Sequence, residues 1–78
     1  MPDSKTRRLN PNKLLLSKWT AVAPKNKEKH FLVTQLIQSE IPEAPIEHIE
    51  LEAVYSHRRF ILPWRDLTDS GQWLQGWL

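Results

Sequence analysis

The chain has 78 residues, a formal net charge of +2 and no cysteine. A chain this short forms one domain and buries only roughly 60–65% of its unfolded surface, so its stability must come from apolar packing. The lack of cysteine excludes disulfides and thiolate metal sites, and it fits a cytoplasmic protein.

The charges are distributed unevenly along the chain. Eight of the eleven Lys and Arg residues lie in residues 1–30 with only two acids, whereas residues 31–78 hold three Arg and seven acids. Such asymmetry indicates either a nucleic-acid footprint or a pairing of the two halves. The longest apolar run, Leu14-Leu15-Leu16, is far below the ~20 residues that span a bilayer. We therefore expect a soluble protein without stable membrane insertion.

The basic N-terminal segment is predicted to be a tail. Residues 1–12 are polar and hold two prolines, so we expect a mobile basic tail followed by a single globular domain at 13–78. Residues 14–22, bounded by Pro11 and Pro24, contain β-branched and aromatic residues and predict the first strand.

The middle of the chain predicts a strand and a loop. Residues 31–37 carry apolar side chains at both parities, which is typical of a strand covered on both faces. Pro42 and Pro45 then exclude a central strand and predict a loop at 39–45.

The following hairpin has the clearest pattern. Residues 46–55 alternate acidic and apolar side chains, as a half-buried antiparallel strand does, and residues 58–62 are predicted to pair with them. A two-residue turn at Ser56-His57 would place Leu51 opposite Leu62 and Ala53 opposite Phe60.

The C-terminal segment predicts a short helix. Asp66 or Asp69 can cap it, and Trp73 and Trp77 stand four residues apart within 70–77, so both would lie on one apolar face. The expected fold is α+β: a four-stranded antiparallel β-meander, or a small half-open barrel, closed by this helix. The expected core comprises Trp19, Phe31, Leu51, Phe60, Leu62, Trp64, Trp73 and Trp77.

Two stretches are distinctive in combination: NPNKLLLSKWTAVAPKNKEKHFLVT near the start and RRFILPWRDLTDSGQWLQGWL at the end. Over residues 10–78 they resemble a bacterial family of short tryptophan-rich proteins of unknown function. The resemblance implies no activity, ligand or catalytic residue.

Catalytic and metal chemistry find little support in the sequence. The three histidines, His30, His48 and His57, lie on different elements and lack metal-ligand spacing, and two glycines cannot form a phosphate-binding loop. We expect no enzyme activity, no cofactor and no metal.

Nucleic-acid binding is the leading functional hypothesis. Small β domains bind single strands by combining a basic groove with aromatic stacking platforms. Trp19 or Trp64 would serve as the platform, with Arg7-Arg8 as a clamp in the tail, and RNA or single-stranded DNA as the partner. The candidate phosphate-binding residues are Lys18, Lys25, Lys27, Lys29, Arg58, Arg59 and Arg65. The competing interpretation is a solvated basic loop with every Trp packed inside.

A protein-interaction module is the alternative hypothesis. A partly exposed patch of Trp64, Trp73 and Trp77, or an open sheet edge, would suit a protein partner or a second copy of the chain. The sequence leaves this choice open.

Overall fold

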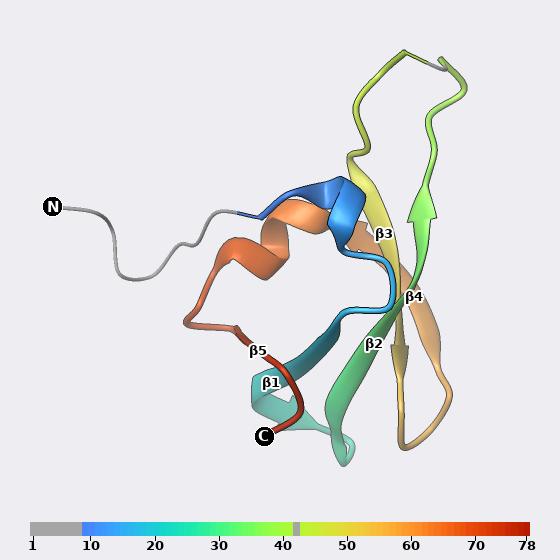
Figure 1. The fold of residues 1–78 in the computed structure, drawn as a ribbon. Coiled ribbons are helices and arrows are strands. Elements are labelled where there is room, and N and C mark those ends of the chain that lie inside the picture. Colours follow the sequence, from blue (N-terminus) through green and yellow to red (C-terminus); the bar gives the residue numbers. More distant parts are fainter. Residues whose placement is uncertain (1–8, 42) are drawn as a thin grey trace, which may run out of the picture.

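The computed structural model describes residues 9–41 and 43–78 and shows an all-β chain of five antiparallel strands (Figure 1). The strands are β1 (Lys18–Lys25), β2 (Glu28–Ile37), β3 (His48–Ala53), β4 (Arg59–Pro63) and β5 (Trp73–Gln75). Within these residues the only helices are two short 3-10 turns, η1 (Pro11–Lys13) and η2 (Trp64–Thr68). The predicted α+β fold of four strands and a C-terminal helix is therefore wrong.

The five strands form one sheet in the order β4-β3-β2-β1-β5, so β4 and β5 are its edges. The first four strands follow one another as a meander, and η2 with the turn after it carries the chain from one edge to the other. Figure 1 shows η1 and η2 on the same side of the sheet. Each supplies a buried leucine to the core, Leu14 at the end of η1 and Leu67 within η2.

The core lies on this inner face of the sheet. Alternate residues of β3 are buried, in the period-2 pattern expected of a strand with one covered face. The largest fully buried side chains are Trp19, Ile49, Leu51, Leu67 and Val33. No helix in the described part of the chain has the length and apolar character needed to cross a membrane.

Only part of the predicted N-terminal tail, residues 1–12, can be compared with the structure. Most of the predicted tail, including Arg7-Arg8, lies outside the described residues. Its last residues belong to η1, where the Asn10 side chain accepts a hydrogen bond from the Asn12 amide. The first strand begins at Lys18 rather than at residue 14, because Leu15 and Leu16 form a turn in which Leu16 has a φ of 66°.

The β3–β4 hairpin is present, but its predicted register is wrong by two residues. Leu51 lies opposite Phe60 and Glu52 opposite Arg59, because the loop is longer than the predicted two residues. The Ala53 amide donates to Arg58 O at 2.8 Å, and residues 54–57 form the loop. A shift of two residues preserves the faces, so the apolar side chains still point inward.

The predicted C-terminal helix is a strand. β5 pairs with β1 through Trp19↔Gln75, Thr20↔Leu74 and Ala21↔Trp73. The backbone of β1 beside the buried Trp19 needs hydrogen-bond partners, and a strand supplies them where a helix cannot. Asp69 does not begin a helix as predicted; it follows the last residue of η2, and its Oδ1 accepts the Gly71 amide at 2.8 Å in the turn before β5.

Candidate functional site

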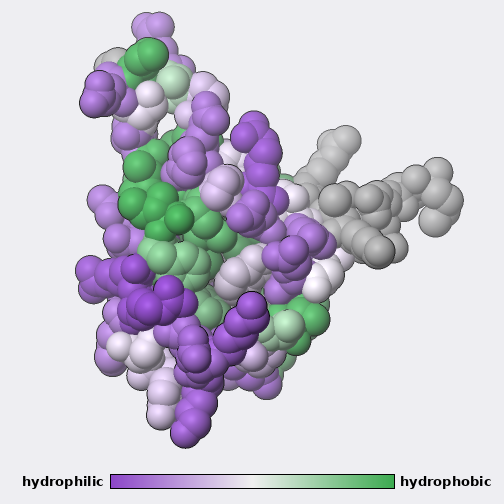
Figure 2. All heavy atoms as spheres, turned by 180° about the vertical axis from the view of Figure 1, so that it is seen from behind, coloured by the Kyte–Doolittle hydropathy of each residue, from purple (hydrophilic) through white to green (hydrophobic). Residues whose placement is uncertain are grey.

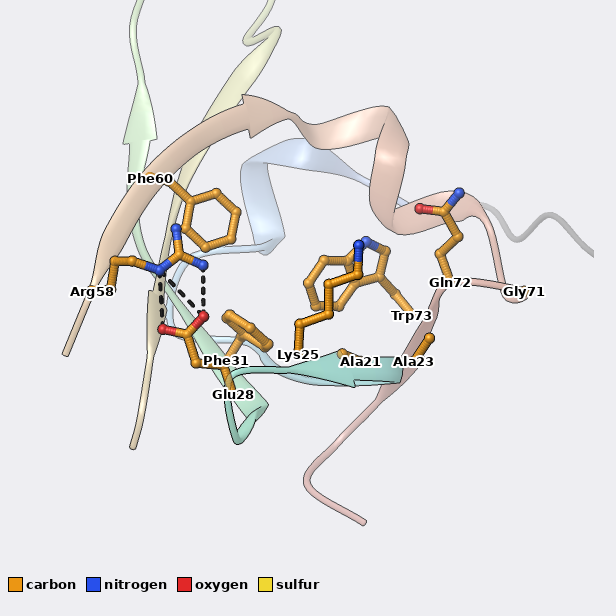
Figure 3. A pocket seen from close by; sticks show the side chains of 10 residues that line it. All are labelled: Ala21, Ala23, Lys25, Glu28, Phe31, Arg58, Phe60, Gly71, Gln72 and Trp73. Carbon is orange, nitrogen blue, oxygen red and sulfur yellow. Dashed lines mark hydrogen bonds and ion pairs between the residues drawn. The ribbon is translucent and has the colours of Figure 1, made fainter. Parts of the chain in front are cut away.

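A pocket of about 460 Å³ opens between the β1–β2 hairpin, the start of β4 and the turn that leads into β5. Figure 3 shows β1 along one side of it and β4 along the other. Figure 2, which views the molecule from behind, shows a hydrophobic area rimmed by hydrophilic residues. The pocket is lined by Ala21, Ala23, Lys25, Glu28, Phe31, Arg58, Phe60, Gly71, Gln72 and Trp73.

Three aromatic rings from three strands form the apolar wall of the pocket. Phe31 of β2 meets Phe60 of β4 edge-on, with ring centroids 5.9 Å apart and planes at 86°. It meets Trp73 of β5 in the same way at 5.1 Å and 86°. Such edge-to-face contacts are favoured by the quadrupoles of the rings. Phe60 and Trp73 are only half-buried, so this wall is the outer end of the core.

Space for the pocket comes from an irregularity in β1. Thr20 pairs with His30 and Lys25 with Glu28, so residues 21–24 of β1 face only Lys29 of β2. Extra residues in one strand bend it away from its partner. Here β1 leaves β2 and continues along β5, where the Val22 amide donates to Gln72 O at 2.9 Å. Ala21 and Ala23 line the widened space with small side chains.

An ion pair joins the two hairpin tips at the pocket mouth. Arg58 donates from Nε and Nη2 to the Glu28 carboxylate, with Nη2 to Oε1 at 2.7 Å, and the Ser56 hydroxyl donates to Oε2 (Figure 3). The Arg58 guanidinium also lies 4.7 Å from the centre of the Phe60 ring. Glu28 is only 5% exposed. The hydrogen bonds from Arg58 and Ser56 lower the pKa of Glu28 from 4.5 to about 2, and they hold it as a carboxylate.

Five of the seven predicted phosphate-binding residues gather at this end of the sheet. Asn26 and Lys27, with φ of 55° and 64°, form the turn between β1 and β2, which carries Lys25 and Lys29 on either side. Arg58 and Arg59 stand at the neighbouring start of β4. Arg59 lies opposite Glu52, and its Nε donates to Glu52 Oε1 at 3.1 Å. The two arginines are therefore partly neutralised.

The three lysines of the β1–β2 tip, Lys25, Lys27 and Lys29, are exposed. Across residues 9–41 and 43–78, the ion pairs are His57–Glu52, Arg58–Glu28 and Arg59–Glu52, and none involves these lysines. The remaining candidates lie elsewhere. Arg65 belongs to η2 and covers the Trp64 ring, and Lys18 opens β1 on the outer face.

The tryptophans differ from their predicted roles. Trp19 is 0% exposed and donates from Nε1 to Ser17 Oγ at 2.8 Å, so it cannot stack on a ligand. Trp64 is half-buried against the core, and its Nε1 is the one buried side-chain polar atom without a hydrogen-bond partner in the described chain. Trp73, expected in the core or in a partly exposed patch, is half-buried and lines the pocket.

Trp77, predicted in the core, is 42% exposed. Gly76, at a φ of 86°, ends β5 and turns the chain, and the Trp77 Nε1 donates to Phe31 O at 2.9 Å. Lys18 Nζ lies 4.9 Å from the ring centre. The His30 ring lies 6.0 Å away and is tilted by 33°. Trp77 therefore lies on the surface beside β1 and β2.

The described residues contain no group of three His, Cys, Asp or Glu side chains that could hold a metal ion. His30 instead contacts the C-terminal residue, with its Nε2 2.9 Å from Leu78 O. His57 lies 3.0 Å from Glu52 Oε2 at the β3–β4 loop.

Sequence reasoning missed the pocket because it assigned Phe31, Phe60 and Trp73 to a closed core. The available signal was the alternation of Ala21 and Ala23 with Val22, which places two small side chains on one face of β1. The pairing of β1 with β5, which brings Trp73 opposite Ala21, has no local signal in the sequence.

Comparison with known proteins gives one match. No curated protein and no solved structure matches the chain. The family model for the tryptophan-rich protein family DUF2389 matches residues 17–78, which comprise all five strands and all four tryptophans. The chain therefore belongs to this tryptophan-rich family, whose function is unknown.

Proposed function

We propose that this protein is a non-catalytic domain that binds single-stranded nucleic acid at the hairpin end of its sheet. The observation that carries the proposal is the position of Lys25, Lys27 and Lys29 beside a pocket with an aromatic wall. Cationic side chains that are not already paired contact phosphates and release counterions, which makes binding favourable and dependent on salt. Aromatic rings close to such a basic surface supply stacking for unpaired bases.

The chemistry at the pocket mouth favours binding over catalysis. Glu28 is the acidic side chain that lines the pocket, and its pKa of about 2 leaves it ionised at neutral pH. A general acid or base works best with a pKa near the working pH. Glu28 is thus a poor proton carrier, and its contacts with Arg58 make it a structural partner.

Titration of fluorescently labelled single-stranded RNA and DNA at low salt tests this function. We expect binding that weakens steeply as salt rises, because lysine–phosphate contacts dominate it. Changing Lys25, Lys27 and Lys29 together to Glu should abolish binding. Absence of binding to both RNA and DNA at low salt would contradict the proposal.

A matched pair of single substitutions controls for net charge. Lys27→Glu removes a cation at the hairpin tip, whereas Lys13→Glu removes one from η1. Both variants change the net charge equally. Only Lys27→Glu should weaken binding strongly and flatten its salt dependence. Equal losses in both variants would show general attraction instead of a site at the hairpin end.

The open sheet edges favour a second candidate function, association with a protein partner or a second copy. β4 and β5 are the two edges, and β4 carries Ile61 with 58% exposure. An unpaired strand edge with an exposed apolar side chain can pair with another strand. Size-exclusion chromatography with light scattering tests self-association, which a monomer at all concentrations would exclude.

A further inference from the structure

We infer that the pocket receives one unstacked nucleotide, with its base against the aromatic wall and its phosphate between Lys25 and Arg58. This inference rests on the proposed function and names the unit that the site recognises. It extends the role of the hairpin end from general attraction of phosphates to the capture of a single base.

The aromatic wall has a shape that suits a flat, apolar group. Figure 3 shows the Phe60 and Trp73 rings next to Phe31 at the pocket. Phe31 stands nearly perpendicular to both of these rings, which fixes its neighbours through edge-to-face contacts. A base that enters from the mouth meets rings that are already in place, so little ordering is needed on binding.

The size of the pocket fits one nucleotide unit. Its volume of about 460 Å³ lies within the range of about 300–1,000 Å³ that is typical of small-ligand sites. Ala21 and Ala23 keep this space open on the side of β1. A larger side chain at either position would occupy the volume that a base needs.

The charges at the mouth select an anionic ligand. Lys25 and Arg58 line the pocket with Glu28, which leaves one positive charge in excess. Glu28 bonds Nε and Nη2 of Arg58, which leaves both N–H groups of Nη1 and the second N–H of Nη2 to donate to a ligand. Because both Glu28 and the Phe60 ring position the guanidinium, it is prearranged to donate hydrogen bonds to a phosphate oxygen. Glu28 is therefore a positioning residue for Arg58.

Filling the pocket tests this inference without removing any charge. Ala23→Leu places a larger side chain in the pocket, and Val22→Leu, at an exposed neighbouring position that does not line it, is the matched control. The probes are AMP, UMP and short single-stranded RNA and DNA oligomers. We expect Ala23→Leu to weaken oligomer binding by about tenfold, the loss of one stacked base, and to abolish mononucleotide binding. Val22→Leu should bind as the wild type does.

The salt dependence separates the two proposals. Ala23→Leu should retain the wild-type salt slope, because the three tip lysines still contact phosphates. If Ala23→Leu binds oligomers as the wild type does and the triple Lys→Glu variant does not, the proposed function stands and the pocket inference fails. If no variant and no wild-type protein binds any nucleic acid, both fail.

A measurement on the wild-type chain keeps the test independent of how Ala23→Leu folds. In NMR spectra of the wild-type chain with AMP, the amide signals of Phe31, Phe60 and Trp73 should shift, and those of β3 near His48 should not. Shifts confined to the lysine loop would overturn the inference. A short acidic peptide with one aromatic residue serves as the competing probe. One outcome is that the wild-type chain binds this peptide but neither AMP nor the oligomers, and that Ala23→Leu loses the peptide. That result would assign the pocket to a protein partner and overturn the inference of a nucleotide site.

Discussion

Arg58 and Glu28, which are 30 residues apart in the chain, join the tips of two hairpins. Arg58 follows the β3–β4 loop, Glu28 opens β2, and the Arg58 Nη2 lies 2.7 Å from Glu28 Oε1. The same pair borders the pocket and orients the guanidinium over Phe60. One ion pair thus links the stability of the sheet end to the shape of the candidate site.

The pH dependence of stability should reveal this pair. The folded pKa of Glu28, about 2, lies below the ordinary value of 4.5. Ionised Glu28 therefore stabilises the fold above pH 4.5, and this contribution is lost as the pH falls from 4.5 toward 2. In urea titrations the wild-type midpoint should fall through this window more steeply than that of Glu28→Gln.

The comparison of variants isolates Glu28 from the other acids. Glu52, whose pKa is also lowered, chiefly by its hydrogen bond from His57, contributes equally to the wild type and to Glu28→Gln. Glu47→Gln, at an exposed position, serves as the matched control. Parallel pH profiles for the wild type and Glu28→Gln would refute a stabilising role for the ion pair.

The loss of stability on replacing each tryptophan by alanine should follow how deeply its ring is buried. Trp19→Ala removes a fully buried ring and should lower the free energy of unfolding by about 3–5 kcal/mol. Trp77→Ala removes one hydrogen bond, a cation–π contact and a half-covered ring, which together are worth about 1–2 kcal/mol. Trp73→Ala should fall between them. Chemical denaturation measures all three, and an equal loss for Trp77 and Trp19 would place Trp77 in the core after all.

The sequence pattern predicted the positions of the first four strands better than the hairpin register and the pairing of the C-terminal segment. Alternation of acidic and apolar residues identified β3, because one face of that strand is buried and the other is not. The register of the hairpin was missed since the Ser56-His57 dipeptide carries no strong turn signal, and His57 takes a positive φ of 63° inside a longer loop.

The C-terminal segment shows why spacing alone misleads. Trp73 and Trp77 stand four residues apart, which fits a helix, but Gly76 turns the chain between them. One tryptophan therefore lines the pocket and the other lies exposed beside Lys18. The pairing of β5 with β1 joins residues more than fifty positions apart, and no local pattern encodes it. The pocket depends on this pairing, so the sequence could not predict the pocket either.

The β1–β2 turn offers a substitution that separates stability from binding. Lys27 has a φ of 64°, a value that is strained for most residues with a Cβ, Asn and Asp excepted. Lys27→Gly should raise the free energy of unfolding by about 0.5 kcal/mol. Relief of the backbone strain stabilises the folded chain by more than the added conformational entropy of glycine stabilises the unfolded chain. The same variant should lower the salt slope of nucleic-acid binding by about 1, through loss of one cation.

Lys29→Gly is the control for Lys27→Gly. It removes the same charge from β2, where glycine weakens a strand by about 0.5–1 kcal/mol. The two variants should therefore shift stability in opposite directions while both reduce the salt slope. Destabilisation by Lys27→Gly would show that the turn does not strain this lysine.

Gly76 should matter for its backbone conformation and not for lack of space. A Cβ built on Gly76 meets no atom within 4 Å, yet the residue has a φ of 86°. Gly76→Ala should therefore cost about 1 kcal/mol through backbone strain alone, and Gly76→Asn should cost less because Asn tolerates this region. Gln75→Ala, at an exposed position of β5, is the control and should be nearly neutral. Denaturant titration with amide exchange at Gly76, whose amide donates to Lys18 O at 2.7 Å, measures the effect. Equal losses for Ala and Asn would mean that Gly76 acts through some contact of its surroundings and not through its φ.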